Sequence, residues 1–196
     1  PQGAQSLVAA LARPDDPAGV SAVLAALDRL LVDGTRFVLL GGVPEALTQE
    51  LEVARRKHAG RFAHVATEDE ASVRTAFSGA DLFLVPSPVE PHATWLRRAM
   101  AAGVIPVAAQ CGGLFQYVRE WDAGRDAGNG FVFSSKTTDG LLDACRTAVR
   151  EIADPLVRRK LAERCAAADF SSPALAAAHA ALYERLAARP QAALAA

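Results

Sequence analysis

The stretch from Asp81 to Leu114 reads DLFLVPSPVEPHATWLRRAMAAGVIPVAAQCGGL, and it indicates the fold of the whole chain. Two apolar runs, 82–85 and 104–109, predict buried strands. The segment 94–102 between them predicts a helix that ends at Gly103. This order of strand, loop, helix, strand and Gly-rich turn is typical of a parallel α/β sheet. Both loops then follow the carboxyl ends of strands, where ligands bind in open parallel sheets.

The rest of the chain continues this alternation of short apolar runs and helical periods. Further strands are predicted at 6–12, 37–40, 62–66 and 131–133, and further helices at 19–32, 44–58, 68–77, 138–152, 155–167 and 173–188. The strands are apolar throughout, so helices are expected to cover both faces of the sheet. The prediction is an α/β, Rossmann-like, doubly wound parallel sheet with C-terminal helices. It forms one domain over 1–188, followed by a frayed tail over 189–196.

Composition places the chain among globular proteins with a substantial core. Of its 196 residues, 51% are hydrophobic and 22% charged. The net charge of −1 and the scattered Lys and Arg residues argue against nucleic acid or a membrane surface as partner. No apolar run approaches the roughly 20 residues of a membrane span, and no signal peptide is visible. The chain lacks an initial Met, so we expect it to begin within a longer protein.

The cysteines and histidines do not predict a metal site. The three Cys residues are far apart and lack the spacing of metal ligands, which indicates free thiols in a reduced compartment. No cluster of His, Asp and Glu has ligand spacing either. The sequence therefore predicts neither a metal nor another cofactor.

Two polar residues of the Pro-rich loop are candidates for sugar chemistry. Glu90 can bond a sugar hydroxyl or stabilise developing positive charge. The alternative is an acid in the first turn of a helix, which favours the helix dipole. His92 lies in the same loop and can act as a base or bind a sugar.

A second group of candidates suits an anion. Gly112 and Gly113 can present backbone N–H groups to a phosphate, although a plain turn with positive φ explains them equally. Arg13 follows the first predicted strand and can reach a phosphate; a solvated loop Arg is the alternative. Cys111 is either a thiol of lowered pKa or a small packing residue. There is no GxGxxG and no GxxxxGK[ST], so the usual dinucleotide and P-loop signatures are absent.

Several short motifs occur in the order of one known family. They are RFVLLGG (36–42), GADLFLVPS (79–87), EP (90–91), AM..G..PVA (99–108), GGL (112–114), GFVF (130–133) and DFS (169–171). In this order they resemble the C-terminal half of bacterial glycogen synthases and plant starch synthases, the family 5-like glycosyltransferases of GT-B fold. The resemblance covers nearly the whole chain.

The resemblance implies a retaining glucosyltransferase built from two Rossmann-like lobes. Such an enzyme moves glucose from ADP-glucose to the non-reducing end of an α-1,4-glucan, without a further cofactor. The C-terminal lobe binds the nucleotide and the N-terminal lobe mainly binds the acceptor. This chain resembles the C-terminal lobe alone, so it is not expected to catalyse transfer by itself. The implied compartment is the bacterial cytoplasm or the plastid.

The resemblance also assigns roles to individual residues. Glu90 matches the Glu of the EPCG motif, the catalytic residue that contacts the transferred glucose. Arg13 matches an Arg that binds phosphate. The remaining positions that match nucleotide-sugar contacts are His92 and Ala93 at the Cys-Gly of EPCG, and Cys111, Gly112, Gly113 and Leu114 at the TGGL motif.

Departures from the family pattern leave two other functions open. The Lys expected to neutralise the diphosphate falls at Ala18, and the basic residue before Glu90 is Pro88. Loss of one such cation weakens transition-state stabilisation by about 3 kcal/mol. A non-catalytic lobe that associates with glucan or with protein is therefore the alternative. A third possibility is another sugar donor, but the second Glu common in that broader group is replaced by Arg98.

Overall fold

The computed structural model describes residues 6–31, 34–66, 69–87, 93–134, 137–168 and 172–187. The chain divides into two compact units, 1–166 and 167–196, which are treated separately below. The first contains the sheet and most of the helices. The second contains the helix α8 (Ser172–Ala187). The prediction of one domain over 1–188 stays a prediction.

The first unit is built on a six-stranded sheet of order β3-β2-β1-β4-β5-β6. Every neighbouring pair of strands is parallel. The strands are β1 (Leu7–Leu11), β2 (Arg36–Leu40), β3 (Phe62–Val65), β4 (Leu82–Val85), β5 (Ile105–Ala109) and β6 (Phe131–Phe133). This is the strand order of a Rossmann fold, and it confirms the predicted fold class.

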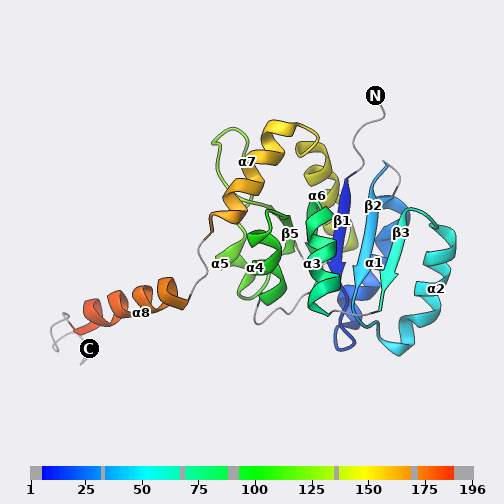
Figure 1. The fold of residues 1–196 in the computed structure, drawn as a ribbon, viewed down its shortest axis with the longest axis horizontal. Coiled ribbons are helices and arrows are strands. Elements are labelled where there is room, and N and C mark those ends of the chain that lie inside the picture. The colour runs from blue at the N-terminus through cyan, green and yellow to red at the C-terminus, as the bar shows by residue number, and fades with distance from the viewer. Residues whose placement is uncertain are drawn as a thin grey trace. The chain divides into compact units, whose positions relative to one another are not determined.

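Helices cover both faces of the sheet (Figure 1). The helices of the first unit are α1 (Pro17–Leu30), α2 (Thr48–Lys57), α3 (Glu70–Gly79), α4 (Thr94–Ala101), α5 (Leu114–Tyr117), α6 (Thr138–Glu151) and α7 (Pro155–Ala166). Helix α1 packs against α2 and α6 on one side, while α4 packs against α7 on the other. This double covering explains why β4 and β5 are buried along their whole length.

Side-chain caps fix the start of three helices. The carboxylate of Asp16 accepts a hydrogen bond from the N–H of Gly19 at 3.0 Å and begins α1. Asp69 caps α3 and Thr137 caps α6 in the same way. Each cap satisfies a backbone donor that has no partner within the helix, so these short polar residues set the helix boundaries.

One carboxylate ties three elements together at the amino end of the sheet. Asp81, directly before β4, accepts a hydrogen bond from the N–H of Leu7 on β1 at 2.9 Å. Its second oxygen accepts one from the guanidinium of Arg158 on α7 at 2.8 Å. Arg158 also donates to the carbonyl of Ile152 at 3.1 Å. Asp81 therefore links two central strands to a helix of the outer layer.

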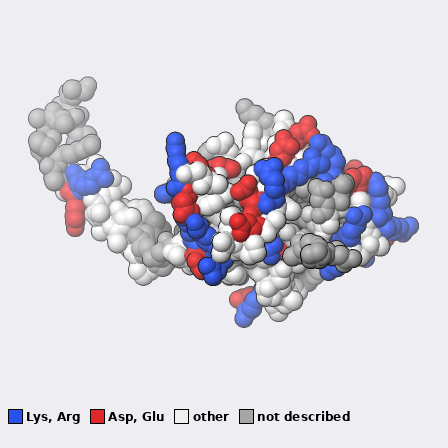
Figure 2. All heavy atoms as spheres, turned by 90° about the horizontal axis from the view of Figure 1, so that it is seen from above, with Lys and Arg blue, Asp and Glu red and all other residues white. Residues whose placement is uncertain are grey.

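The structure differs from the sequence prediction in small elements. The helix predicted over 44–58 begins with a separate 3-10 turn, Glu45–Leu47, before α2. The four-residue helix α5 was not predicted, because so short a helix has no detectable period. Acidic and basic side chains are intermixed on the face seen in Figure 2, in keeping with the scattered charges of the sequence.

Candidate functional site

The order in which the chain adds strands to the sheet reverses between the parallel neighbours β1 and β4. From β1 the chain passes to β2 on one side, while from β4 it passes to β5 on the other. Loops that leave the two strands therefore separate at their carboxyl ends and open a crevice, the usual ligand site of such sheets. One small cavity at this place is lined by residues from both loops, including Arg13, Ser87 and Trp95. The structure thus brings Arg13 beside the loop that follows β4.

Arg13 is held at the edge of this crevice by a surface contact. Its Nε lies 3.3 Å from the Oδ1 of Asp15, and 29% of its side chain is exposed. Asp15 is far more exposed, so the ion pair is weak and its partner can be exchanged for a ligand. The guanidinium is a planar fork of donors that matches phosphate oxygens. Arg13 therefore lies at the crevice with donors that suit phosphate, and its role as a phosphate ligand stays a prediction.

A cysteine connects the loops after β4 and β5. The Sγ of Cys111 donates a hydrogen bond to the carbonyl of Ser87 at 3.3 Å. Ser87 is buried, and Cys111 is partly exposed. Cys111 therefore packs the two loops together, which agrees with the interpretation of Cys111 as a packing residue, while the residue itself stays partly exposed.

Gly112 and Gly113 lie in a tight turn, and their backbone N–H groups donate no hydrogen bond within the described part of the chain. Gly112 has φ +47°, and the N–H of Leu114 closes the turn on the carbonyl of Cys111 at 3.1 Å. A side chain at Gly113 would meet nothing within 4 Å, so this residue borders open space. Leu114 is buried and anchors the turn. Within the described part of the chain, no hydrogen bond joins the N–H of Gly112 or Gly113 to another residue. Both groups can therefore donate to a ligand.

Ala93 holds the backbone in an unusual conformation where α4 begins. It has φ 47° and ψ 27°, the left-handed region, and it is buried. Left-handed conformations cost a residue with a Cβ about 1–2 kcal/mol. The family motif has Gly at this position, which adopts this conformation without steric cost. Strain of this kind is concentrated at ligand sites, where the surrounding structure maintains it.

Replacing Ala93 by Gly is expected to raise the free energy of unfolding by about 0.5–1 kcal/mol, since relief of strain exceeds the entropy cost of Gly. Urea unfolding measures the change. The control is Ala25→Gly on the exposed side of α1, which should lower stability by about 1 kcal/mol. A loss of stability in both variants would mean that residue 93 is not left-handed in solution.

Two predicted site residues, Glu90 and His92, lie outside the described residues, as does Pro88. Their roles stay predictions. The described part of the chain contains no group of three or more His, Cys, Asp and Glu residues that could hold a metal ion. None of its helices is long and apolar enough to cross a membrane.

The three thiols differ in their environment. Burial raises the pKa of Cys145 and of Cys165 to about 12, so both stay protonated at neutral pH. Cys111 is the partly exposed one of the three. A thiol reagent therefore has one accessible target, and it lies at the crevice.

Comparison with known proteins identifies the family. The family model for the glycosyl transferases group 1 matches residues 5–151. The chain belongs to this family. It is 38% identical to a glycogen synthase of Anaeromyxobacter dehalogenans over 86% of this chain and 35% of that protein. It is also 33% identical to a glycogen synthase of Alkalilimnicola ehrlichii, over 84% of the chain and 34% of that protein. The chain thus spans about a third of the length of these glycogen synthases.

Solved structures of glycosyltransferases have the same fold. The catalytic domain of starch synthase IV from Arabidopsis thaliana, bound to ADP and acarbose, matches with a TM-score of 0.79 and 30% identity. The match covers 94% of this chain and 39% of that one. Sucrose-phosphate synthase from Thermosynechococcus elongatus matches with a TM-score of 0.69 at 24% identity, which shows the fold alone. The resemblance to the GT-B lobe of glycogen and starch synthases is therefore confirmed.

Sequence reasoning missed two residues at this glycosyltransferase crevice, Asp16 and Ser87. Asp16 caps α1. Its position directly before Pro17 could have predicted the cap, since Pro favours the first position of a helix. Ser87 receives the Cys111 hydrogen bond through its carbonyl, which no sequence pattern reveals. Trp95 follows the loop after β4, where it could either stack a ligand or pack in the core; it is half-buried and lines two cavities.

Proposed function

We propose that this chain is the nucleotide-sugar-binding lobe of a glucosyltransferase that uses ADP-glucose to extend α-1,4-glucan. The proposal rests on a set of hydrogen-bond donors that can bind an anion and that lie at the carboxyl ends of the strands. The guanidinium of Arg13 follows β1, and the unused N–H groups of Gly112 and Gly113 follow β5. Such donors suit the diphosphate of a nucleotide-sugar. A starch synthase IV related to this chain holds ADP.

Each predicted site residue has a role in this proposal. Arg13 and the Gly pair bind the diphosphate, and Glu90 contacts the transferred glucose. Cys111 and Leu114 hold the turn that presents the Gly N–H groups. Ala93 is the residue before α4, and His92 and Ala93 contact the nucleotide-sugar in this proposal.

Catalysis requires more than this chain supplies. Because the chain spans about a third of the glycogen synthases that it matches, the acceptor side of the cleft belongs to the other lobe in this proposal. The chain alone then binds the donor but does not transfer glucose. The second candidate is a non-catalytic lobe, and Ala18 favours it. This residue is exposed in the first turn of α1, where the family has a Lys.

Modification of Cys111 tests where the nucleotide binds. Iodoacetamide is expected to modify a single thiol of the native chain, Cys111, because the other two are buried. ADP at about ten times its dissociation constant should slow this reaction about tenfold, since only the free chain reacts. Mass spectrometry of quenched samples identifies the modified residue and gives the rate.

The unfolded chain is the control and should be modified at all three thiols. Modification of Cys111 at an unchanged rate, at an ADP concentration where binding is independently measured, would place the nucleotide elsewhere. Absence of ADP binding would instead favour the non-catalytic lobe.

A further inference from the structure

The turn that carries Gly112 and Gly113 leads directly into α5. The N–H of Gln116 donates to the carbonyl of Gly113 at 3.0 Å, so the helix is bonded to the Gly pair. The N–H of Val118 donates to the carbonyl of Leu114 at 2.9 Å, where the helix ends. A helix of four residues is too short to keep its shape by itself. The placement of the Gly N–H groups therefore depends on the contacts that hold the two ends of this segment.

Side chains hold the segment at both ends. At its start, the Sγ of Cys111 donates to the carbonyl of Ser87 at 3.3 Å. At its end lies the side-chain amide of Asn129, just before β6. The Nδ2 of Asn129 donates to the carbonyl of Tyr117, the last residue of α5, at 2.9 Å. Its Oδ1 accepts a hydrogen bond from the N–H of Arg119 at 2.8 Å. Asn129 therefore fixes the chain on both sides of the residue where α5 ends.

Helix α7 holds the backbone around Asn129 in place. The carbonyl of Asn129 accepts a hydrogen bond from the Sγ of Cys165 at 3.1 Å. The guanidinium of Arg164 donates to the carbonyl of Gly128 at 3.2 Å. A side chain at Gly128 would clash with the carbonyl of Glu120, so the two arms of this hairpin lie in direct contact. The amide of Asn129 therefore reaches the end of α5 from a firmly held support.

We propose that Asn129 is a positioning residue for the phosphate-binding turn. It does not touch the nucleotide-sugar. It fixes the end of α5 and thereby keeps the N–H groups of Gly112 and Gly113 where they bind the diphosphate. Such groups bind well only when supporting contacts hold them within about 0.5 Å of the productive position. The inference rests on the proposed function, in which these two N–H groups are ligands of the diphosphate.

Substitution of Asn129 by Ala tests this role, because it removes both side-chain hydrogen bonds. Asn129 does not have a positive φ, so Ala introduces no backbone strain. Calorimetric titration of the 196-residue chain with ADP should show binding weakened about fivefold to tenfold. Hydrogen exchange, followed by NMR, should become about tenfold faster at the N–H groups of Gln116 and Val118. Asn129→Ser, whose hydroxyl can replace one of the two bonds, should give a smaller effect in both measurements.

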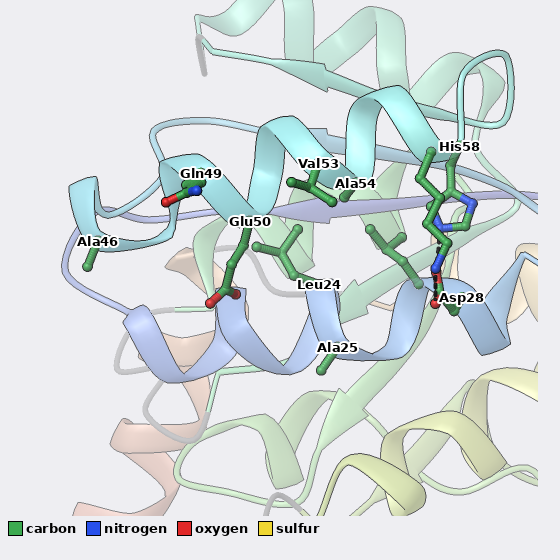
Figure 3. Close-up of a pocket in the computed structure, with 11 residues that line it drawn as sticks. Leu24, Ala25, Asp28, Ala46, Gln49, Glu50, Val53, Ala54 and His58 are labelled. Carbon is green, nitrogen blue, oxygen red and sulfur yellow. Dashed lines mark hydrogen bonds and ion pairs between the residues drawn. The ribbon is translucent and has the colours of Figure 1, made fainter.

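Asp28→Ala is the matched control. Asp28 lies on α1, at one end of a groove of about 500 Å³ between α1 and α2 (Figure 3). Its carboxylate is hydrogen-bonded to Lys57 at 2.5 Å and to the Nε2 of the buried His58 at 2.6 Å, so this variant also loses two side-chain bonds. These bonds join α1 to the end of α2, whereas the turn follows β5. The variant should lower the urea midpoint of unfolding about as much as Asn129→Ala does, yet bind ADP within about twofold of the parent chain.

The outcomes separate this inference from the proposed function. If the parent chain binds ADP and Asn129→Ala binds it equally well, Asn129 is not a positioning residue. Equal weakening of ADP binding in Asp28→Ala would also overturn the inference, because a general loss of stability would then explain both variants. Unchanged exchange at Gln116 and Val118 would show that the turn keeps its structure without Asn129. Failure of the parent chain to bind ADP would contradict the proposed function itself, and the positioning role with it.

Discussion

Replacing Asp81 by Ala is expected to lower the free energy of unfolding by about 3 kcal/mol. The side chain is 19% exposed and the side chain of Arg158 33%, so neither group is fully screened by water. The substitution removes the acceptor of the Leu7 N–H, and it removes the carboxylate from the guanidinium of Arg158, which keeps its bond to the carbonyl of Ile152. Hydrogen bonds to a charged group contribute about 1.5–3 kcal/mol each, which makes two lost bonds a large effect.

Chemical unfolding in urea, followed by circular dichroism, measures this loss. Asp81→Asn keeps an acceptor for Leu7 but loses the charge, so an intermediate loss of about 1–2 kcal/mol is expected. Glu163→Ala serves as the control, because its pair with Arg159 spans 3.7 Å between side chains that are both mostly exposed. That change should cost less than about 0.5 kcal/mol. A loss as small for Asp81→Ala as for Glu163→Ala would show that Asp81 does not link β1, β4 and α7.

The sheet could be predicted from the sequence because its strands are continuous apolar runs. The runs 82–85 and 131–133 match β4 and β6 residue for residue, and burial on both faces is the cause. The helices were found through their hydrophobic period. The short elements were not: α5 has only four residues, and a 3-10 turn precedes α2. Such short elements form through local hydrogen bonds, and these bonds leave no hydrophobic period in the sequence.

The site was predictable in its position and less so in its contacts. Arg13 and the pair Gly112–Gly113 could be placed at one sheet edge because parallel strands align their carboxyl ends. The hydrogen bond from Cys111 to Ser87 depends on two residues 24 positions apart whose types do not signal it. The strain at Ala93 also escaped prediction, since nothing in its residue type indicates a left-handed backbone.

Removing the guanidinium of Arg13 is expected to weaken ADP binding about tenfold or more. A charge-assisted hydrogen bond to phosphate contributes about 1.5–3 kcal/mol, whereas the surface pair of Arg13 with the exposed Asp15 is weak. Ala18→Lys restores the cation of the family motif on the first turn of α1. This variant should bind ADP about tenfold more tightly for the same reason. Arg125→Ala is the control, because that Arg lies on the exposed hairpin before β6 and pairs only weakly with Asp122.

The most direct test of the nucleotide-sugar site is calorimetric titration of the 196-residue chain with ADP, with UDP as the comparison. We expect ADP to bind in the micromolar range, more tightly than UDP, with clear weakening in Arg13→Ala and none in Arg125→Ala. If neither nucleotide binds at millimolar concentration, even to Ala18→Lys, the crevice between β1 and β4 is not a nucleotide-sugar site, and the non-catalytic lobe becomes the better description of this chain.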